Sequence, residues 1–562
     1  MRAHTQGSKL ELRAVSGTHV VTLAWDFVGP RPAKSRNLLG FMVERSELKN
    51  GQVIENYALR GIKRFRFKDQ GLPPGTPVPT SEHPVQTFQW GDYTAKPQTK
   101  YRFRLTPVFG APKNLVRDAT LAVEVEIVTE AERDPRTTGV RHDIFFNRGA
   151  AGSQAYARRF PDTKPDETKP LSEQMAWLSR GLFEALTGFI KRANGPQFKL
   201  RAMLYEFQYA PVGEAFKAAH LAGAGVDVRY EAQSYKDHNE AMIAAVGIDA
   251  FCRPQAVRNG IRHNKFIVLI ENNVAVEVWT GSTNISAGGI FGHSNVGHIV
   301  RDPAIAQRYH DYWDELAVDP VDVADLKKTN RELEPTPATG APPPDDRVMT
   351  LFSPRDVATK VPTLHWYGDL MGSAKRLMGM TFAFNFDDIF IQALAGNSEA
   401  IRYLLFDKKL PQDVEMSLRQ DGHTVIAAGA KLKAGDMELF LGEELTGFNK
   451  NLYIHDKFII IDVLGSDPIV VTGTANFSKP SQAANDENML VIRGDKRVGD
   501  IYFGEFMRVF DHLYARYIVR KIKDEGGGDP NAGFLKEKVS DWLDPHFKAG
   551  HKSLRREVFM GR

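Results

Sequence analysis

Two stretches that carry a histidine and a lysine two positions apart are the part of this sequence best suited to chemistry. Residues 261–270 read IRHNKFIVLI, and residues 453–462 read YIHDKFIIID. Each stretch is followed by a small Gly-x-x-Asn segment, and the glycine comes 18 positions after the histidine in both copies (263 to 281 and 455 to 473). Two copies with equal spacing predict two similar half-domains that build one site together.

The residue types in this repeat are those that phosphoryl transfer needs. On a β-strand, residues two apart leave the same face, so the histidine and lysine of each copy stand together before a buried apolar run. A neutral imidazole is a nucleophile or base near pH 7, a lysine is a positive charge, and Gly-x-x-Asn supplies a turn and an amide donor. Two such sets around one anion predict transfer through a covalent phosphohistidine, for which no metal or other cofactor is required.

The pattern His-x-Lys-x4-Asp followed by Gly-x-x-Asn, present twice, resembles the phospholipase D superfamily. The second copy matches that pattern at His455, Lys457, Asp462, Gly473 and Asn476. The first copy matches it at His263, Lys265, Gly281 and Asn284. It has Ile270 where the superfamily has the aspartate, and Glu271 comes one residue late, which turns it to the opposite face of a strand.

An acidic residue that hydrogen-bonds the motif histidine is a further feature of the superfamily. Glu487, which follows the second Gly-x-x-Asn segment, fits that place, and we expect it to orient His455. In the first copy Ser294 stands where this glutamate would be. The resemblance therefore implies two unequal halves, with a carboxylate missing beside His263.

The resemblance also assigns roles. His263 is the nucleophile, and His455 is the general acid and then the base that activates water. The missing carboxylate leaves the reversed assignment open. The phosphoryl oxygens are bound by lysines and asparagines, namely Lys265, Lys457, Asn284 and Asn476. Asp462 and Glu487 complete the expected catalytic set. Substrate contacts are expected from six further residues, namely Gly281, Ser282, Gly473, Thr474, Ser294 and Asn295.

The superfamily chemistry is cleavage or transfer at a phosphodiester, and the sequence leaves the alcohol groups open. The leading hypothesis is a phospholipase D-type enzyme that hydrolyses or transfers phospholipid head groups, because two unequal halves fit an asymmetric substrate. One alternative is an endonuclease of the same fold that acts on DNA or RNA. Its candidate phosphate contacts are Arg201, Arg229, Arg258 and Arg262. The other alternative is a catalytically weak phosphate-binding protein, for which Ile270 and Ser294 are the evidence.

The overall composition is that of an ordinary globular protein, with 562 residues of which 42% are apolar. The 73 basic and 69 acidic residues give a net charge of +4, which is too small to imply nucleic acid or an anionic membrane by itself. A single cysteine, Cys252, excludes an internal disulfide framework and a cysteine-rich zinc site.

The sequence shows neither the apolar core of a signal peptide nor about 18 continuous apolar residues, so we expect no integral membrane span. We therefore expect a cytoplasmic protein, with export by a route that needs no signal peptide left open. Both motifs lie in one chain, so we also expect a monomer.

The first and last segments of the chain have sequence patterns that differ from that of the middle. Residues 8–132 alternate apolar with polar residues between Gly/Pro turns, which predicts an all-β sandwich. Trp25 and Tyr101 resemble the core tryptophan and corner tyrosine of a fibronectin type III module. Residues 523–562 form a C-terminal extension, which we expect to dock on the protein. The alternative is an interfacial membrane anchor.

The middle of the chain is predicted to be α/β. Residues 138–328 and 348–522 each run helix, strand, helix, strand before the motif, and a Pro-rich linker, residues 329–347, joins them. This order predicts duplicated phospholipase D-like α/β/α half-domains that form one pseudo-twofold catalytic unit.

Overall fold

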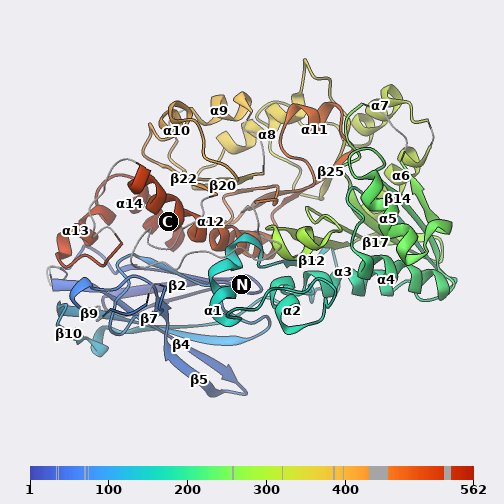
Figure 1. The fold of residues 1–562 in the computed structure, drawn as a ribbon. Helices are drawn as coiled ribbons and strands as arrows, with labels where there is room; N and C mark the ends of the chain where they lie inside the picture. The colour runs from blue at the N-terminus through green and yellow to red at the C-terminus, as the bar shows by residue number, and fades with distance from the viewer. Residues whose placement is uncertain are drawn as a thin grey trace.

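Figure 1 shows the fold of the chain in a computed structural model. The structure describes all residues except 33–34, 36, 69–70, 74, 256–258, 319, 384–386, 396–397, 430–453 and 525–532. A layered set of strands at the N-terminus is blue, a first α/β part is green, and a second α/β part runs from yellow to red. The last helices lie between the blue strands and the second α/β part.

The N-terminal part consists of β-sheets, as its alternating sequence predicts. A four-stranded sheet has the order β1-β2-β3-β8, formed by Arg2–Gln6, Leu10–Ser16, Val21–Phe27 and Gln89–Asp92. A five-stranded sheet has the order β10-β9-β4-β5 with β11 also on β9, formed by Asn114–Arg117, Lys100–Ala111, Leu38–Lys49, Gln52–Ala58 and Val123–Val128. Trp25 and Tyr101 are fully buried in the core that these sheets share.

Each α/β part is built on a seven-stranded sheet. The first has the order β12-β18-β17-β16-β13-β14-β15, formed by Arg141–Phe146, Val296–Arg301, Val274–Gly281, Lys265–Glu271, Phe198–Leu204, Gly225–Tyr230 and Cys252–Pro254. The second has the order β19-β25-β24-β23-β20-β21-β22, formed by Met349–Ser353, Glu487–Arg493, Ile469–Gly473, Phe458–Ile461, Leu377–Phe382, Ile401–Phe406 and Thr424–Ala428. The two orders are the same, so the chain is a duplication of one α/β unit.

The strands that follow the two motifs, β16 and β23, occupy the centre of their sheets and are apolar because both of their faces are covered. Ile267 of β16 faces a core with α3 (Leu182–Lys191) and α4 (Ala210–Leu221). Phe266, on the opposite face, packs with α6 (Pro303–Ala317) in a core that also contains α12 (Lys496–Asp524). Since that core also holds Phe458 of β23, it joins the two halves.

The connector between the halves is partly helical. Helix α7 runs over Val323–Leu333 and so includes the first residues of the predicted linker. The Glu334 carboxylate then pairs with Arg308 at 2.7 Å and with Arg347, and Trp366 donates to the backbone oxygen of Ala341 at 2.8 Å. These contacts hold the described part of the linker against both halves.

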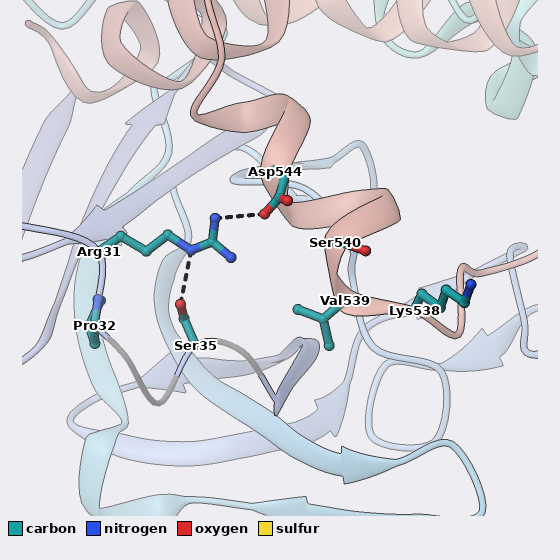
Figure 2. A pocket seen from close by; sticks show the side chains of 7 residues that line it. All are labelled: Arg31, Pro32, Ser35, Lys538, Val539, Ser540 and Asp544. Atoms are coloured by element: carbon teal, nitrogen blue, oxygen red, sulfur yellow. Dashed lines mark hydrogen bonds and ion pairs between the residues drawn. The ribbon is translucent and has the colours of Figure 1, made fainter.

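The C-terminal extension docks on the N-terminal sheets, as expected. Trp542 and Leu543 of α13 (Val539–Leu543) are buried in the core of these sheets, and α14 (His551–Met560) contributes to the core between the halves. Figure 2 shows an open hollow beside α13, where Arg31 pairs with Asp544 at 2.7 Å. Within the described residues, no helix is both long and apolar enough to cross a bilayer.

Candidate active site

The two motifs meet where the halves cross. The backbone N–H of His263 donates to the oxygen of Asp486 at 3.1 Å, and the N–H of His455 donates to the oxygen of Ser294 at 3.2 Å. Each motif is therefore paired with the segment that follows the Gly-x-x-Asn of the other half. Equivalent residues of the two halves lie 192 positions apart (263 and 455, 294 and 486), so the two contacts are related by a pseudo-twofold axis.

His263 is bonded to a carboxylate from the second half. Its Nδ1 lies 2.7 Å from Oε2 of Glu487, and both side chains are buried. Asn485 donates to the other carboxylate oxygen at 3.2 Å. An ionised carboxylate only accepts hydrogen bonds, so Nδ1 carries the proton and Nε2 keeps its lone pair. Burial lowers the pKa of His263 to about 4. The expectation that Glu487 orients His455 is wrong, because the hydrogen bond crosses between the halves.

His455 is bonded to an amide from the first half. Its Nδ1 lies 2.8 Å from Oδ1 of Asn295. The Asn295 NH2 group donates to the oxygen of Gly289 at 2.7 Å, and this bond turns the amide oxygen toward the imidazole. Counted from the preceding glycine, Asn295 is the counterpart of Glu487 (281 to 295 and 473 to 487), so the assignment of that place to Ser294 was one residue early. The first half, which has Asn295 in place of a carboxylate, thus orients His455.

The two motif lysines are buried and close enough to repel each other. Lys265 Nζ donates to the oxygen of His263 at 2.7 Å, and Lys457 Nζ donates to the oxygen of His455 at 2.6 Å. Burial lowers the pKa of Lys265 to about 7. Burial, and next the charge of Lys265, hold the pKa of Lys457 well below its ordinary value. A bound anion would relieve both effects, so this arrangement suits a phosphate group.

The motif asparagines differ in their surroundings. Asn284 Nδ2 donates to Oε1 of Glu206 at 2.5 Å. Asn476 is held through its backbone N–H, which donates to Ser481 Oγ at 3.2 Å. The Oδ1 atoms of Asn284 and Asn476 are buried, and neither has a hydrogen-bond partner among the described residues.

Three residues that the sequence analysis missed lie beside the motifs. Tyr205 places its ring 4.7 Å from the His263 ring, and Lys265 Nζ lies 4.9 Å from its centre. Glu206 is the next residue. Both follow β13, which neighbours β16, so their position after a predicted central strand was a usable signal. His293 has its ring 6.1 Å from that of His455, and burial lowers its pKa to about 4. Nothing in the sequence marks His293.

Asp462 lies away from the site, which corrects its expected catalytic role. It follows the last residue of β23, whereas Lys457 precedes the first, and its carboxylate accepts the backbone N–H groups of Lys375, Arg376 and Leu377 at 2.8 to 2.9 Å. Its counterpart Ile270 is buried in the core. The Asp-to-Ile difference between the copies therefore concerns strand packing and leaves the anion site unchanged.

The two Gly-x-x-Asn segments, from which substrate contacts are expected, are closely packed against neighbouring strands. A Cβ atom on Gly281 would lie 2.3 Å from the oxygen of Val296, and one on Gly473 would lie 2.1 Å from the oxygen of Asn488, so close strand packing requires both glycines. Ser282 Oγ is hydrogen-bonded to Asn295 Oδ1 at 2.8 Å.

The remaining two expected contacts are also buried. Thr474 Oγ1 accepts from the N–H of Asn488 at 2.9 Å, which ties it to β25. Ser294 Oγ is buried and has no partner within the described part of the chain. The glycines, Ser282 and Thr474 therefore have packing roles in the fold, and contact of these residues with substrate stays a prediction.

The arginines proposed as nucleic-acid contacts have other roles where the structure describes them. Arg262 is completely buried beside Asp486 at 3.3 Å. Arg201 and Arg229 both lie 5.3 Å from the Trp313 ring. Arg258 is outside the described residues. Within the described part, no group of three or more His, Cys, Asp or Glu residues is placed to hold a metal ion.

Comparison with known proteins gives a partial match. Residues 370–513 match a family described as "Cardiolipin synthase, PLD-like domain". No curated protein matches the chain. Among solved structures, the phospholipase D family member Nuc from Salmonella typhimurium is 20% identical over 24% of this chain and 85% of its own, with a TM-score of 0.22. Phosphatidylserine synthase from Haemophilus influenzae is 11% identical over 62% and 91%, with a TM-score of 0.42.

Polyphosphate kinase from Porphyromonas gingivalis is 11% identical over 89% of this chain and 81% of its own, with a TM-score of 0.39. These identities and TM-scores are too low to say anything about activity. The family match and the repeated sheet order agree: the chain has a phospholipase D-like α/β fold with a β-rich N-terminal part.

Proposed function

We propose that this protein is a phospholipase D-type phosphodiesterase that cleaves or transfers phospholipid head groups through a covalent phosphohistidine. The observation that carries the proposal is the crosswise bonding of the two motif histidines. Both imidazoles have their Nδ1 protons held by the opposite half, and two buried lysines lie beside them. This arrangement supplies a nucleophile, a proton donor and charge for one phosphate group.

In the first step, His263 Nε2 bonds to phosphorus while the bond from phosphorus to the leaving oxygen breaks. The Glu487 carboxylate accepts a hydrogen bond from the Nδ1–H group and so stabilises the positive charge that develops on the ring. His455 gives the proton on its Nε2 to the leaving oxygen. An amide partner suits this second role, because Asn295 stabilises the charged ring less than a carboxylate does and the proton is given up more readily.

In the second step, water or an alcohol attacks phosphorus and His455 accepts its proton. The bond between phosphorus and His263 then breaks, and the free imidazole is restored. Lys265 and Lys457 offset the charge on the phosphoryl oxygens in both steps. Burial and the two lysines hold the pKa of His455 well below 6.5 in the empty site. The negative charge of the bound diester opposes the lysines, so substrate binding itself favours the protonated His455 that the first step needs.

A lipid substrate is favoured over nucleic acid by the description of the matching family and by the engagement of the described candidate arginines elsewhere. We further propose that the catalytic unit works as a monomer, since one chain supplies both motifs, and that the N-terminal sheets are a fibronectin type III-like module.

The test is to incubate the protein with vesicles of choline or ethanolamine phospholipid and, separately, with plasmid and single-stranded DNA. Release of the head group, abolished in His263→Ala and in His455→Ala, is the expected result. Strand cleavage without head-group release would instead identify a nuclease. Inertness on both, with binding of phosphate-bearing ligands retained, would indicate a binding protein.

A further inference from the structure

Glu206 lies beside the proposed phosphate site and contacts a residue of the repeated motif. Its Oε1 accepts a hydrogen bond of 2.5 Å from the NH2 group of Asn284. The hydroxyls of Ser286 and Tyr235 are also hydrogen-bonded to its carboxylate, and Lys265 contributes an attractive charge. Glu206 thus joins the wall of the site to an asparagine that the motif places near the phosphate.

The hydrogen bonds of Asn284 pose a problem for phosphate binding. Only its NH2 group can donate to a phosphoryl oxygen, and one of the two hydrogens of that group is engaged with Glu206. The amide oxygen is buried and finds no partner in the described part of the chain, with the side chain 4% exposed. A carbonyl oxygen and a phosphoryl oxygen are both acceptors, so in this orientation the amide oxygen of Asn284 cannot bind the anion and at most one N–H is left to do so. A buried oxygen without a donor also carries a free-energy cost.

We propose that Glu206 is a positioning residue whose proton sets the orientation of Asn284. When Glu206 is ionised, it holds the NH2 group of Asn284. When Glu206 takes up a proton, the amide of Asn284 turns over, the Glu206 O–H donates to the amide oxygen, and both hydrogens of the NH2 group become available to phosphoryl oxygens. The inference rests on the proposed function only in placing a phosphodiester between the motifs.

The charges around Glu206 favour this exchange when substrate binds. Burial raises the pKa of Glu206, and Lys265 opposes that rise. The charge of Glu206 also acts to raise the pKa values of Lys457, Tyr205 and Tyr235. A phosphodiester anion between the lysines would offset their attraction for the carboxylate and raise its pKa further. Binding should therefore be accompanied by uptake of a proton on Glu206.

Asn476 provides an internal control. It occupies the equivalent position of the second half, and none of the described carboxylates is hydrogen-bonded to its side chain. Its own amide oxygen is also buried without a partner among those residues. The proposal therefore predicts that protonation of a neighbouring carboxylate changes the orientation of Asn284 but not that of Asn476.

The experiment compares the wild type with Glu206→Gln, whose NH2 group can donate to the Asn284 oxygen as a protonated glutamate would. The probe is dimethyl phosphate, a diester whose charge is constant between about pH 5.5 and 8.5. Its affinity for the wild type should fall about tenfold more across that range than its affinity for Glu206→Gln, because one hydrogen bond to the anion is lost. Lys265, whose pKa burial lowers to about 7, titrates within this range as well, so only the difference between the two profiles that Asn284→Ala removes counts.

Calorimetry in buffers of different ionisation enthalpy supplies a second readout. The wild type should take up more protons on binding than Glu206→Gln does. Asn284→Ala should remove the difference between the two proteins, whereas Asn476→Ala should weaken binding equally in both. Equal pH dependence of the wild type and Glu206→Gln, or weaker binding by Glu206→Gln at every pH, would overturn the proposal. The assay needs no turnover, so failure to cleave lipid or DNA would refute the proposed function without affecting this result.

Discussion

At the scale of single residues, the two histidines have different partners, and this difference supports the roles proposed for them. Glu487 gives His263 a carboxylate, and Asn295 gives His455 a neutral amide. Residue spacing alone suggested the opposite pairing, because it treats each half as self-contained. The motif residues themselves were predictable from their repeat. Their partners were not, because those hydrogen bonds depend on how the two halves pack.

Replacing Glu487 by glutamine should lower kcat about a hundredfold or more, because the amide no longer stabilises the charge that develops on His263. Steady-state kinetics on a phospholipid or on a chromogenic diester measures this effect. Glu271→Gln is the matched control, since Glu271 is exposed and should leave kcat unchanged. A Glu487→Gln enzyme with wild-type kcat would show that this carboxylate does not assist the nucleophile.

At the scale of secondary-structure elements, Asp462 has a structural role at the end of β23 and lies away from the motif histidine and lysine. A strand rises about 3.3 Å per residue, so five positions after Lys457 place Asp462 roughly 16 Å from it. The spacing in the sequence already implies this separation, although the resemblance places Asp462 in the catalytic set. The α/β class and the duplication were predictable from the alternation of helices and strands, whereas the order of the strands within each sheet was not. The extension of α7 into the predicted Pro-rich linker was not predicted either.

Asp462→Ala should cost about 0.5–2 kcal/mol of unfolding free energy, because three backbone N–H groups lose their acceptor. The kcat of the folded variant should equal that of the wild type. Urea unfolding and steady-state kinetics check the two statements together. Loss of kcat without loss of stability would restore a catalytic role to this aspartate.

A buried pair of histidines lies on neighbouring strands of the first sheet, β12 and β18, and is bonded to a tyrosine of α12. His142 Nδ1 lies 2.9 Å from His298 Nε2, and His298 Nδ1 lies 3.1 Å from the Tyr502 hydroxyl. Burial lowers the pKa of His142 to about 3 and holds that of His298 well below 6.5. Both rings are neutral in the folded protein and take up protons readily when it unfolds. Their contribution to stability is therefore complete above about pH 6.5 and declines as the pH falls toward 3.

The unfolding free energy should fall by up to about 1.4 kcal/mol per pH unit for each of these histidines below pH 6.5. Urea midpoints measured from about pH 7 to pH 4.5 test this expectation. His298→Gln should make the dependence shallower, whereas His365→Gln, at an exposed position, should not. An unchanged slope in His298→Gln would mean that this pair does not govern acid sensitivity.

At the scale of the whole molecule, the N-terminal strand is tied to the second half, and the C-terminal extension is tied to the N-terminal sheets. Arg2 donates to the backbone oxygens of Leu464 at 3.0 Å and Gly465 at 2.7 Å, while Trp542 fills the core of the N-terminal sheets. The extension was expected to dock. Its insertion into the β-sheet core could not be derived, because no periodic pattern links segments about 500 positions apart.

Trp542→Ala should destabilise the N-terminal sheets by about 3–5 kcal/mol, since it leaves a cavity between the rings of Phe41 and Phe88. Chemical unfolding followed by tryptophan fluorescence measures the loss. The matched control is Leu171→Ala, at a side chain that is 74% exposed, which should leave the midpoint unchanged. A stability equal to that of the wild type would show that α13 is a dispensable attachment.

The most direct test of the account is to trap the covalent intermediate in His455→Ala with a p-nitrophenyl phosphodiester. Its leaving group needs no proton donor, so the first step should proceed, and the second should stall without a base to activate water. Mass spectrometry should then find the phosphoryl group on His263, and His263→Ala should give no adduct. An adduct on another residue of His455→Ala, or an adduct on His455 in His263→Ala, would contradict the assignment of nucleophile and acid.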